Sequence, residues 1–398
     1  MRKGKAQRNL LLLCFKQNRV LRQETTSVMS MSTFIRLKYR SAHEIPTAVK
    51  VWLIAGLVMI FFQIVIGGVT RLTGSGLSIT RWEIVTGAVP PLTEEAWAAE
   101  FELYKATPQY QKINEGMALD DFKFIYFWEY FHRLWARLMF FVFIIPFAWF
   151  LWRGMFSRQL VPRMLVVVLL AGFEGFLGWI MVASGLIQRP WVNAYNLTLH
   201  LTMALIIFSY LMWTTFVAFR PNPRVFHKPV LKKYAWGMLL LAFVQIALGA
   251  MMSGTKAGLF YPTWPDMHGS FLPPVLLDAG HWAASSFIEY DTNPFMPALI
   301  QFLHRNTAYI LTIMILYFVW RIARLENARR LQQGNRWLVG VLLVQVALGI
   351  LTVLNCVAKV PVTLGVLHQA GAVLLLSMIL WVTYELTAGK KSTNVDKV

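Results

Sequence analysis

The chain has 398 residues, of which 57% are hydrophobic and 14% charged, and its mean hydropathy is positive. A soluble domain carries about 25% charged residues, so this composition excludes an ordinary soluble fold. The formal net charge of +19 could suggest nucleic-acid binding, but the basic residues gather in short loops between apolar runs, so we expect no nucleic-acid partner.

A basic segment, residues 1–48, precedes the first apolar run. The first 50 residues hold 11 Lys and Arg against two acids, the composition of a mitochondrial transit peptide. A basic tail on the inner side of a membrane, or an overlong gene model with its true start at Met29 or Met31, would also explain it. Its apolar core, "LLLLCF", is too short for a secretory signal.

Eight apolar runs follow, each long enough to cross a bilayer as a helix. The sequence therefore predicts an all-α integral membrane protein with spans at about 51–69, 124–152, 164–184, 196–219, 234–253, 299–320, 337–354 and 363–386.

The connecting segments differ in charge from one side of the membrane to the other. The loops at 153–163, 220–233 and 321–336, with the tail, hold 16 Lys and Arg and two acids. The opposite loops hold 8 Lys and Arg and 12 acids. The positive-inside rule then places both termini inside and the two long loops outside. We expect a bacterial cytoplasmic membrane rather than a mitochondrial inner membrane, since the leader has internal start candidates and no clear cleavage signal.

The chain is a tandem duplication. At an offset of 182, residues 63–82 share seven identities with residues 245–264, among them Gln63, Gly67, Thr73, Gly76, Leu77 and Trp82, which match Gln245, Gly249, Thr255, Gly258, Leu259 and Trp264. Two halves in the same orientation predict tandem, pseudo-symmetric four-helix bundles. The predicted units are a leader (1–48), an N-terminal bundle (49–220) with a long outer loop (70–123), an inside linker (221–233), a C-terminal bundle (234–388) and a polar tail (389–398).

A shorter pattern marks the four odd-numbered spans. The stretches "QIVIG" (63–67), "EGFLG" (174–178), "QIALG" (245–249) and "QVALG" (345–349) each place a carboxamide or carboxylate four residues before a glycine. We interpret the pattern first as a device for packing helices, in which glycine allows close approach and the polar group bonds across the interface.

Four of the eight histidines lie in the first turns of the even-numbered spans, at similar depth near the outer side: His132, His200, His304 and His368. Two facing imidazoles in a four-helix bundle are what bis-histidine heme ligation requires, so the pattern predicts two heme sites. Arg133, Arg137 and Arg305 are placed to bind heme propionates.

Other metal sites fit the residues less well. The Glu129-x-x-His132 motif could belong to a di-iron carboxylate centre, but that centre needs the motif twice, and the second half has Gln301 at the equivalent position. The two cysteines, Cys14 and Cys356, cannot build a disulfide framework or a cysteine-based metal site.

Several long motifs together resemble the heme A synthase family, over about residues 50–386. They are "GGVTRLTGSGLSITRW" (67–82), "DFKFIYFWEYFHRLWARL" (121–138), "LGWIMVASGL" (177–186), "TLHL" (198–201) and "QFLHR" (301–305). The likeness is to the mitochondrial and Gram-negative type, which lacks a cysteine pair in the first outer loop.

The resemblance implies an oxidoreductase that oxidises a methyl group of heme O to a formyl group by successive hydroxylations, giving heme A for terminal cytochrome oxidase. Water is the implied oxygen source, and the electron acceptor is unidentified. It implies further that His132 and His200 face the substrate iron, that His304 and His368 ligate a resident heme b, and that Glu129 is the catalytic carboxylate. Partners would be the heme O substrate, the lipid bilayer, the farnesyltransferase that makes heme O, oxidase assembly factors and a second copy of the chain.

Two points stay open from the sequence. The loop at 79–122 predicts short amphipathic helices that cap the substrate bundle, either as a passive cap or as a docking site. A non-catalytic di-heme cytochrome that takes electrons from quinol would share the four histidines, but it would not explain a carboxylate, Glu129, in one bundle alone. A transporter with parallel repeats is disfavoured by the histidines.

Overall fold

The computed structural model of the protein describes residues 45–81, 87, 89–185, 190–220, 226 and 228–387. Within these ranges all the regular elements are α- or 3-10 helices. Most of the predicted leader, the polar tail and part of the inside linker lie outside the described residues, so the predictions for them are not tested.

Eight long helices confirm the eight predicted spans. They are α2 (Thr47–Leu72), α5 (Leu119–Trp152), α6 (Leu160–Gly185), α7 (Ala194–Phe219), α8 (Pro229–Gly254), α10 (Phe295–Ala323), α11 (Arg329–Leu354) and α12 (Val362–Thr387). Helix α5 begins five residues before the predicted span, because Asp120 and Asp121 lie in its first turn. The helix dipole favours acidic residues in the first turn of a helix. The two aspartates therefore extend α5 beyond the apolar run that the sequence analysis used.

Large apolar side chains cover the outward faces of these helices. Leu169 on α6 is 73% exposed, Leu240 on α8 is 69% exposed and Ile313 on α10 is 68% exposed. Contiguous apolar surface of this kind is rare on soluble proteins, whereas lipid tails solvate it well. The exposed faces and the helix lengths together indicate a multi-pass membrane protein.

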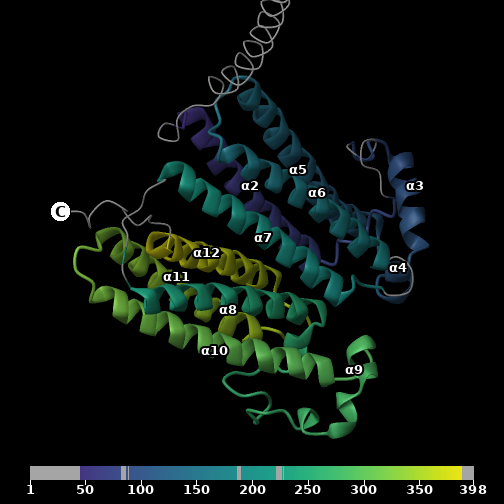
Figure 1. Cartoon of the computed structure of the whole chain (residues 1–398). Coiled ribbons are helices and arrows are strands. Elements are labelled where there is room, and N and C mark those ends of the chain that lie inside the picture. Colours follow the sequence, from purple (N-terminus) through teal and green to yellow (C-terminus); the bar gives the residue numbers. More distant parts are fainter. Residues whose placement is uncertain are drawn as a thin grey trace, which may run out of the picture.

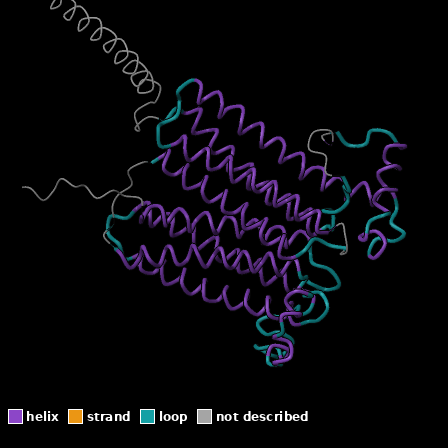
Figure 2. The backbone as a smooth tube through the Cα atoms, turned by 45° about the vertical axis from the view of Figure 1, so that its right-hand side comes forward, coloured by secondary structure: helices purple, strands orange, loops and turns teal. Residues whose placement is uncertain are grey.

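The long helices run side by side, with the connections at their ends (Figure 2). Helix α2 packs against α5 and α7, and α6 packs against α7; in the second half, α10 and α12 pack against α8, and α11 packs against α10 and α12. Figure 1 shows the first four helices on one side of the molecule and the last four on the other. One buried hydrophobic cluster nevertheless includes residues of both halves, so the division into two separate bundles stays a prediction.

The two long connections lie at the same end of the array. Helices α3 (Glu94–Lys105) and α4 (Pro108–Lys112) precede α5, and the short helix α9 (Ala284–Ile288) precedes α10 (Figure 1). The amphipathic helices expected in 79–122 are therefore present. Phe101 and Tyr104 of α3 stack on Phe122 of α5, with ring centroids 5.0 and 5.1 Å apart, which attaches α3 to the start of α5.

Candidate functional site

Each of the four predicted heme-ligating histidines packs against a glycine of the long helix that precedes it in the chain. A Cβ atom added to the glycine would lie 2.8 to 3.2 Å from the imidazole in every case. The pairs are His132 with Gly67, His200 with Gly178, His304 with Gly249 and His368 with Gly349. A Cβ atom at Gly349 would be closer to the ring than real contacts allow, and at the other three glycines the imidazole would have to shift by a few tenths of an ångström. Glycine therefore allows each ring to lie directly on the neighbouring helix.

The polar residue one helical turn before each glycine contacts the same imidazole. Gln63 Nε2 lies 2.9 Å from His132 Nε2, Glu174 Oε1 lies 3.1 Å from His200 Nδ1, Gln245 Nε2 lies 3.1 Å from His304 Nδ1, and Gln345 Nε2 lies 3.1 Å from His368 Nδ1. The "Q/E-x-x-x-G" pattern thus packs helices, as interpreted, and also holds an imidazole. We call each set of polar residue, glycine and histidine a ring-holding unit.

The rings of His304 and His368 face the same space in the C-terminal half. Their centroids are 6.5 Å apart and their planes are inclined by 79°. An imidazole nitrogen binds a metal at about 2 Å, so two rings on opposite sides of one iron have centroids roughly 6–7 Å apart. The separation of these two rings therefore suits bis-histidine ligation.

The polar atoms left without partners also fit a heme. Among the described residues, Gln63 Oε1, Glu174 Oε2, Gln245 Oε1 and Gln345 Oε1 are buried and accept no hydrogen bond. A histidine that binds iron through Nε2 carries its proton on Nδ1 and needs an acceptor there. The units of His200, His304 and His368 place such a side chain at Nδ1 and so suit iron binding through Nε2, whereas Gln63 contacts Nε2 of His132.

His132 on α5 and His200 on α7 form the N-terminal pair. The two rings are close enough to interact electrostatically, and helix α2 contacts both α5 and α7. His200 and Glu174 are each about one fifth exposed, at 20% and 18% of their side-chain surface.

Glu129 is buried, with 3% of its surface exposed, and three donors hold its carboxylate. Oε2 accepts hydrogen bonds from the Ser78 hydroxyl and the Ile79 amide, each at 2.8 Å, and Oε1 pairs with the Arg133 guanidinium. A carboxylate has about four acceptor positions, so one remains for another group. Glu129 also anchors the loop after α2 to the start of α5.

The same anchoring occurs in the second half with a different side chain. Gln301 donates a hydrogen bond of 2.7 Å to the Tyr261 carbonyl, and Tyr261 is the residue 182 positions after Ile79. Arg133 and Arg305 likewise donate to the equivalent carbonyls of Arg81 and Thr263. Both arginines thus hold loops in this structure, and their role at propionates, like that of Arg137, stays a prediction.

Sequence reasoning did not include Glu174 among the site residues. The structure places it against His200, in the position that glutamine occupies in the other three units. The signal was the single acidic residue in the four-fold "Q/E-x-x-x-G" pattern.

No group of three His, Cys, Asp or Glu side chains that could share a metal ion occurs in the described part of the chain. A di-iron carboxylate centre needs more than three such ligands around it.

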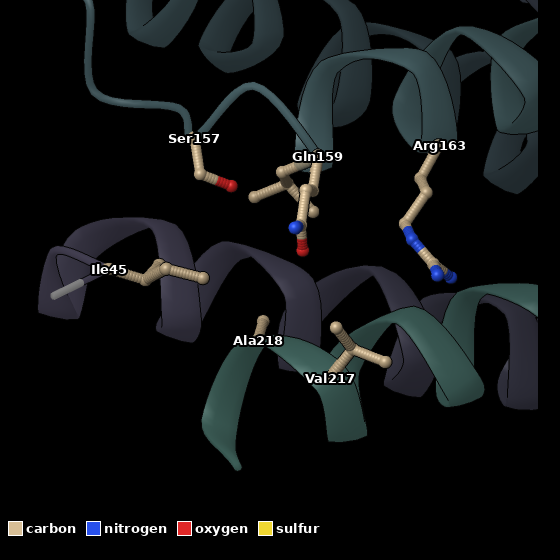
Figure 3. Close-up of a pocket in the computed structure, with 7 residues that line it drawn as sticks. Ile45, Ser157, Gln159, Arg163, Val217 and Ala218 are labelled. Carbon is tan, nitrogen blue, oxygen red and sulfur yellow. The ribbon is translucent and has the colours of Figure 1, made fainter. Parts of the chain in front are cut away.

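A shallow hollow lies at the other end of the helices, lined by Ile45, Ser157, Gln159, Leu160, Arg163, Val217 and Ala218 (Figure 3). Ala218 is 18 residues after His200 on α7, which is about 27 Å along a helix. The hollow is therefore separate from the histidine site.

Comparison with known proteins agrees with these features. The sequence profile of the cytochrome oxidase assembly protein family matches residues 50–380. A protein named heme A synthase from Rhodospirillum centenum is 42% identical over 340 residues, which cover 84% of this chain and 87% of that protein. The heme A synthase of Nitrosomonas eutropha is 38% identical over 370 residues, which cover 92% of this chain and 100% of that protein. The chain belongs to the heme A synthase family.

Proposed function

We propose that the protein converts heme O to heme A by oxidising one methyl group to a formyl group in successive hydroxylations, with water as the oxygen source. Each hydroxylation breaks a C–H bond, forms a C–O bond and releases two electrons and two protons; the second gives a gem-diol, which loses water to leave the formyl group. The observation that carries the proposal is the set of four ring-holding units combined with one buried carboxylate, Glu129, in the N-terminal half.

In this proposal, the C-terminal half holds heme b through His304 and His368, and the bound heme supplies a one-electron redox centre. The 6.5 Å separation of the two rings supports the assignment. His132 and His200 orient the substrate in the N-terminal half. Gln245 and Gln345 hold the C-terminal imidazoles in place through contacts of 3.1 Å.

Glu129 acts as the base or as the electrostatic stabiliser of positive charge that develops on the oxidised carbon. It lies one helical turn from His132, so both side chains project from the same face of α5. Ser78, Ile79 and Arg133 fix the carboxylate before substrate binds, and a preorganised charge needs no reorganisation during reaction. Gln301, at the equivalent position, carries no charge, which matches a site that only transfers electrons.

The setting of the reaction is proposed from the relatives and the loop charges. The relatives compared above are bacterial proteins, which favours a bacterial cytoplasmic membrane. The basic loops between the spans favour both termini inside. Helices α3 and α4 then lie outside, where they could contact the farnesyltransferase that makes heme O or oxidase assembly factors.

Expression in a bacterial strain that makes heme O but not heme A tests the function. We expect heme A in extracts of the complemented strain, separated from heme O by reversed-phase chromatography. A di-heme cytochrome without catalytic activity would give the same bis-histidine absorption spectrum but only heme O in the extract. The absence of heme A from a strain that contains the folded, heme-loaded protein would refute the proposal.

A further inference from the structure

The four ring-holding units differ in one chemical respect. Three of them place a neutral carboxamide against the imidazole, from Gln63, Gln245 and Gln345, whereas the unit of His200 places a carboxylate there. Both halves of the molecule therefore have the same construction, and Glu174 introduces a charge at one of the four rings.

The surroundings of Glu174 make that charge costly. It lies in the apolar helix α6, and its Oε2 is buried without a hydrogen-bond partner. Among the described residues, His200 is its only ion-pair partner. A carboxylate in such a place destabilises the fold unless a partner group compensates for it. A glutamine would pack the helices equally well, as the other three units show.

The contact geometry leaves the pair ready to respond to a ligand. His200 Nδ1 lies 3.1 Å from Glu174 Oε1, but the ring is turned so that its N–H does not point at the oxygen. Binding of iron at Nε2 places the proton on Nδ1, where the carboxylate can accept it.

From this arrangement we infer that Glu174 is a positioning residue that lowers the reduction potential of the heme bound at His200 below that of the heme held by His304 and His368. The inference rests on the proposed function, because it requires a heme in each half. A carboxylate that accepts the Nδ1 proton makes the imidazole a stronger electron donor, and a stronger donor stabilises ferric iron over ferrous iron. At the C-terminal rings, the amide nitrogens of Gln245 and Gln345 lie against Nδ1, and a glutamine side chain brings no negative charge to the imidazole.

The consequence concerns the direction of electron transfer. A heme b held by His304 and His368 would supply a one-electron acceptor for the electrons that methyl oxidation releases. A lower potential in the N-terminal half makes this transfer favourable, so the one carboxylate sets the direction between two halves of the same construction. Gln369, next to His368, donates a 2.8 Å hydrogen bond to the carbonyl of Ile64, next to Gln63, and so joins α12 to α2 beside both sites.

Two reciprocal substitutions test the inference: Glu174→Gln, which makes the unit of His200 match the other three, and Gln345→Glu, which places a carboxylate at His368. The full-length protein is purified, loaded with protoheme and heme O, and titrated by visible spectroscopy at controlled potentials. We expect the wild type to show two one-electron waves. Glu174→Gln should raise only the lower wave, and Gln345→Glu should lower only the higher wave. A tenfold change in the ratio of oxidised to reduced heme corresponds to a shift of about 59 mV.

The outcomes separate the inference from the proposed function. If Glu174→Gln binds both hemes and both waves stay where they are in the wild type, Glu174 has no electronic role and the inference is wrong. If Glu174 were only structural, the variant would bind less heme while the remaining heme kept its potential, which also overturns the inference. If the wild type binds heme in one half alone, the proposed function fails, and the inference fails with it.

Discussion

Glu129 and Gln301 anchor equivalent loops, the first through a carboxylate and the second through a carboxamide. Each is buried near the start of its helix and bonds to the backbone of the preceding loop, through the Ile79 amide in one case and the Tyr261 carbonyl in the other. The glutamine shows that this anchor does not require a charge. Anchoring the loop therefore does not explain the charge on Glu129, which is consistent with its proposed role as base or electrostatic stabiliser.

The substitution Glu129→Gln separates anchoring from chemistry. A glutamine can still accept the Ile79 N–H bond but loses its ion pair with Arg133, so we expect about 1–3 kcal/mol of lost stability. Heme A formation should fall by roughly 10²–10⁴-fold, the usual contribution of an acid–base group. Heme chromatography measures the product, and the visible spectrum should show undiminished heme b. Glu94→Gln, which removes only the exposed pair with Lys123, is the control and should leave heme A output unchanged.

The sequence identified His132, His200, His304 and His368 because they recur in the two halves, and it singled out Glu129 because Gln301 replaces it. It could not predict what Glu129 contacts. Ser78 and Ile79 are about 50 positions away in the chain, and nothing in their local pattern indicates that they turn back onto α5. The sequence showed that Glu174 is the one acidic residue in the four-fold pattern, but it could not show that Glu174 contacts the imidazole of His200.

At the scale of the helix, the glycines are the residues that fix the distance between neighbours. Helix α11 offers a matched pair, Gly349 and Gly340: a Cβ atom at Gly349 would lie 2.8 Å from His368 Cε1, and one at Gly340 would meet nothing within 4 Å. We expect Gly349→Ala to displace the imidazole and to abolish or strongly weaken heme b binding, and Gly340→Ala to keep it. The heme-to-protein ratio of the two purified variants measures the effect, and equal ratios would contradict the role of the glycine.

The sequence could predict the eight membrane-spanning helices, but it could not predict which helices pack against each other. Twenty apolar residues in a row can only cross a bilayer as a helix, so all eight spans followed from composition. The pairing of α2 with α12 depends on single side chains, such as Gln369 against Gly68, that no periodic pattern marks.

At the scale of the whole molecule, the duplicated ends of α2 and α8 meet each other. Arg71 near the end of α2 donates to the carbonyl of Ser253, at 2.8 Å, and to that of Gly254, at the end of α8. Ser253 is the residue 182 positions after Arg71, so the contact joins equivalent points of the two halves. The guanidinium also compensates for the partial negative charge at the end of α8.

The substitution Arg71→Ala should therefore weaken the association of the two halves without altering either heme site. Hydrogen bonds from a charged group contribute about 1.5–3 kcal/mol, and the carbonyls at the end of α8 would lose their donor inside the molecule. We expect a melting temperature lower by about 2–4 °C, with both heme spectra intact below the transition. Arg330→Ala, at an exposed position on α11, removes an equal charge away from the contact between the halves and should melt like the wild type. Equal melting temperatures for the two variants would show that Arg71 does not join the halves, and the shared apolar core would then account for their association.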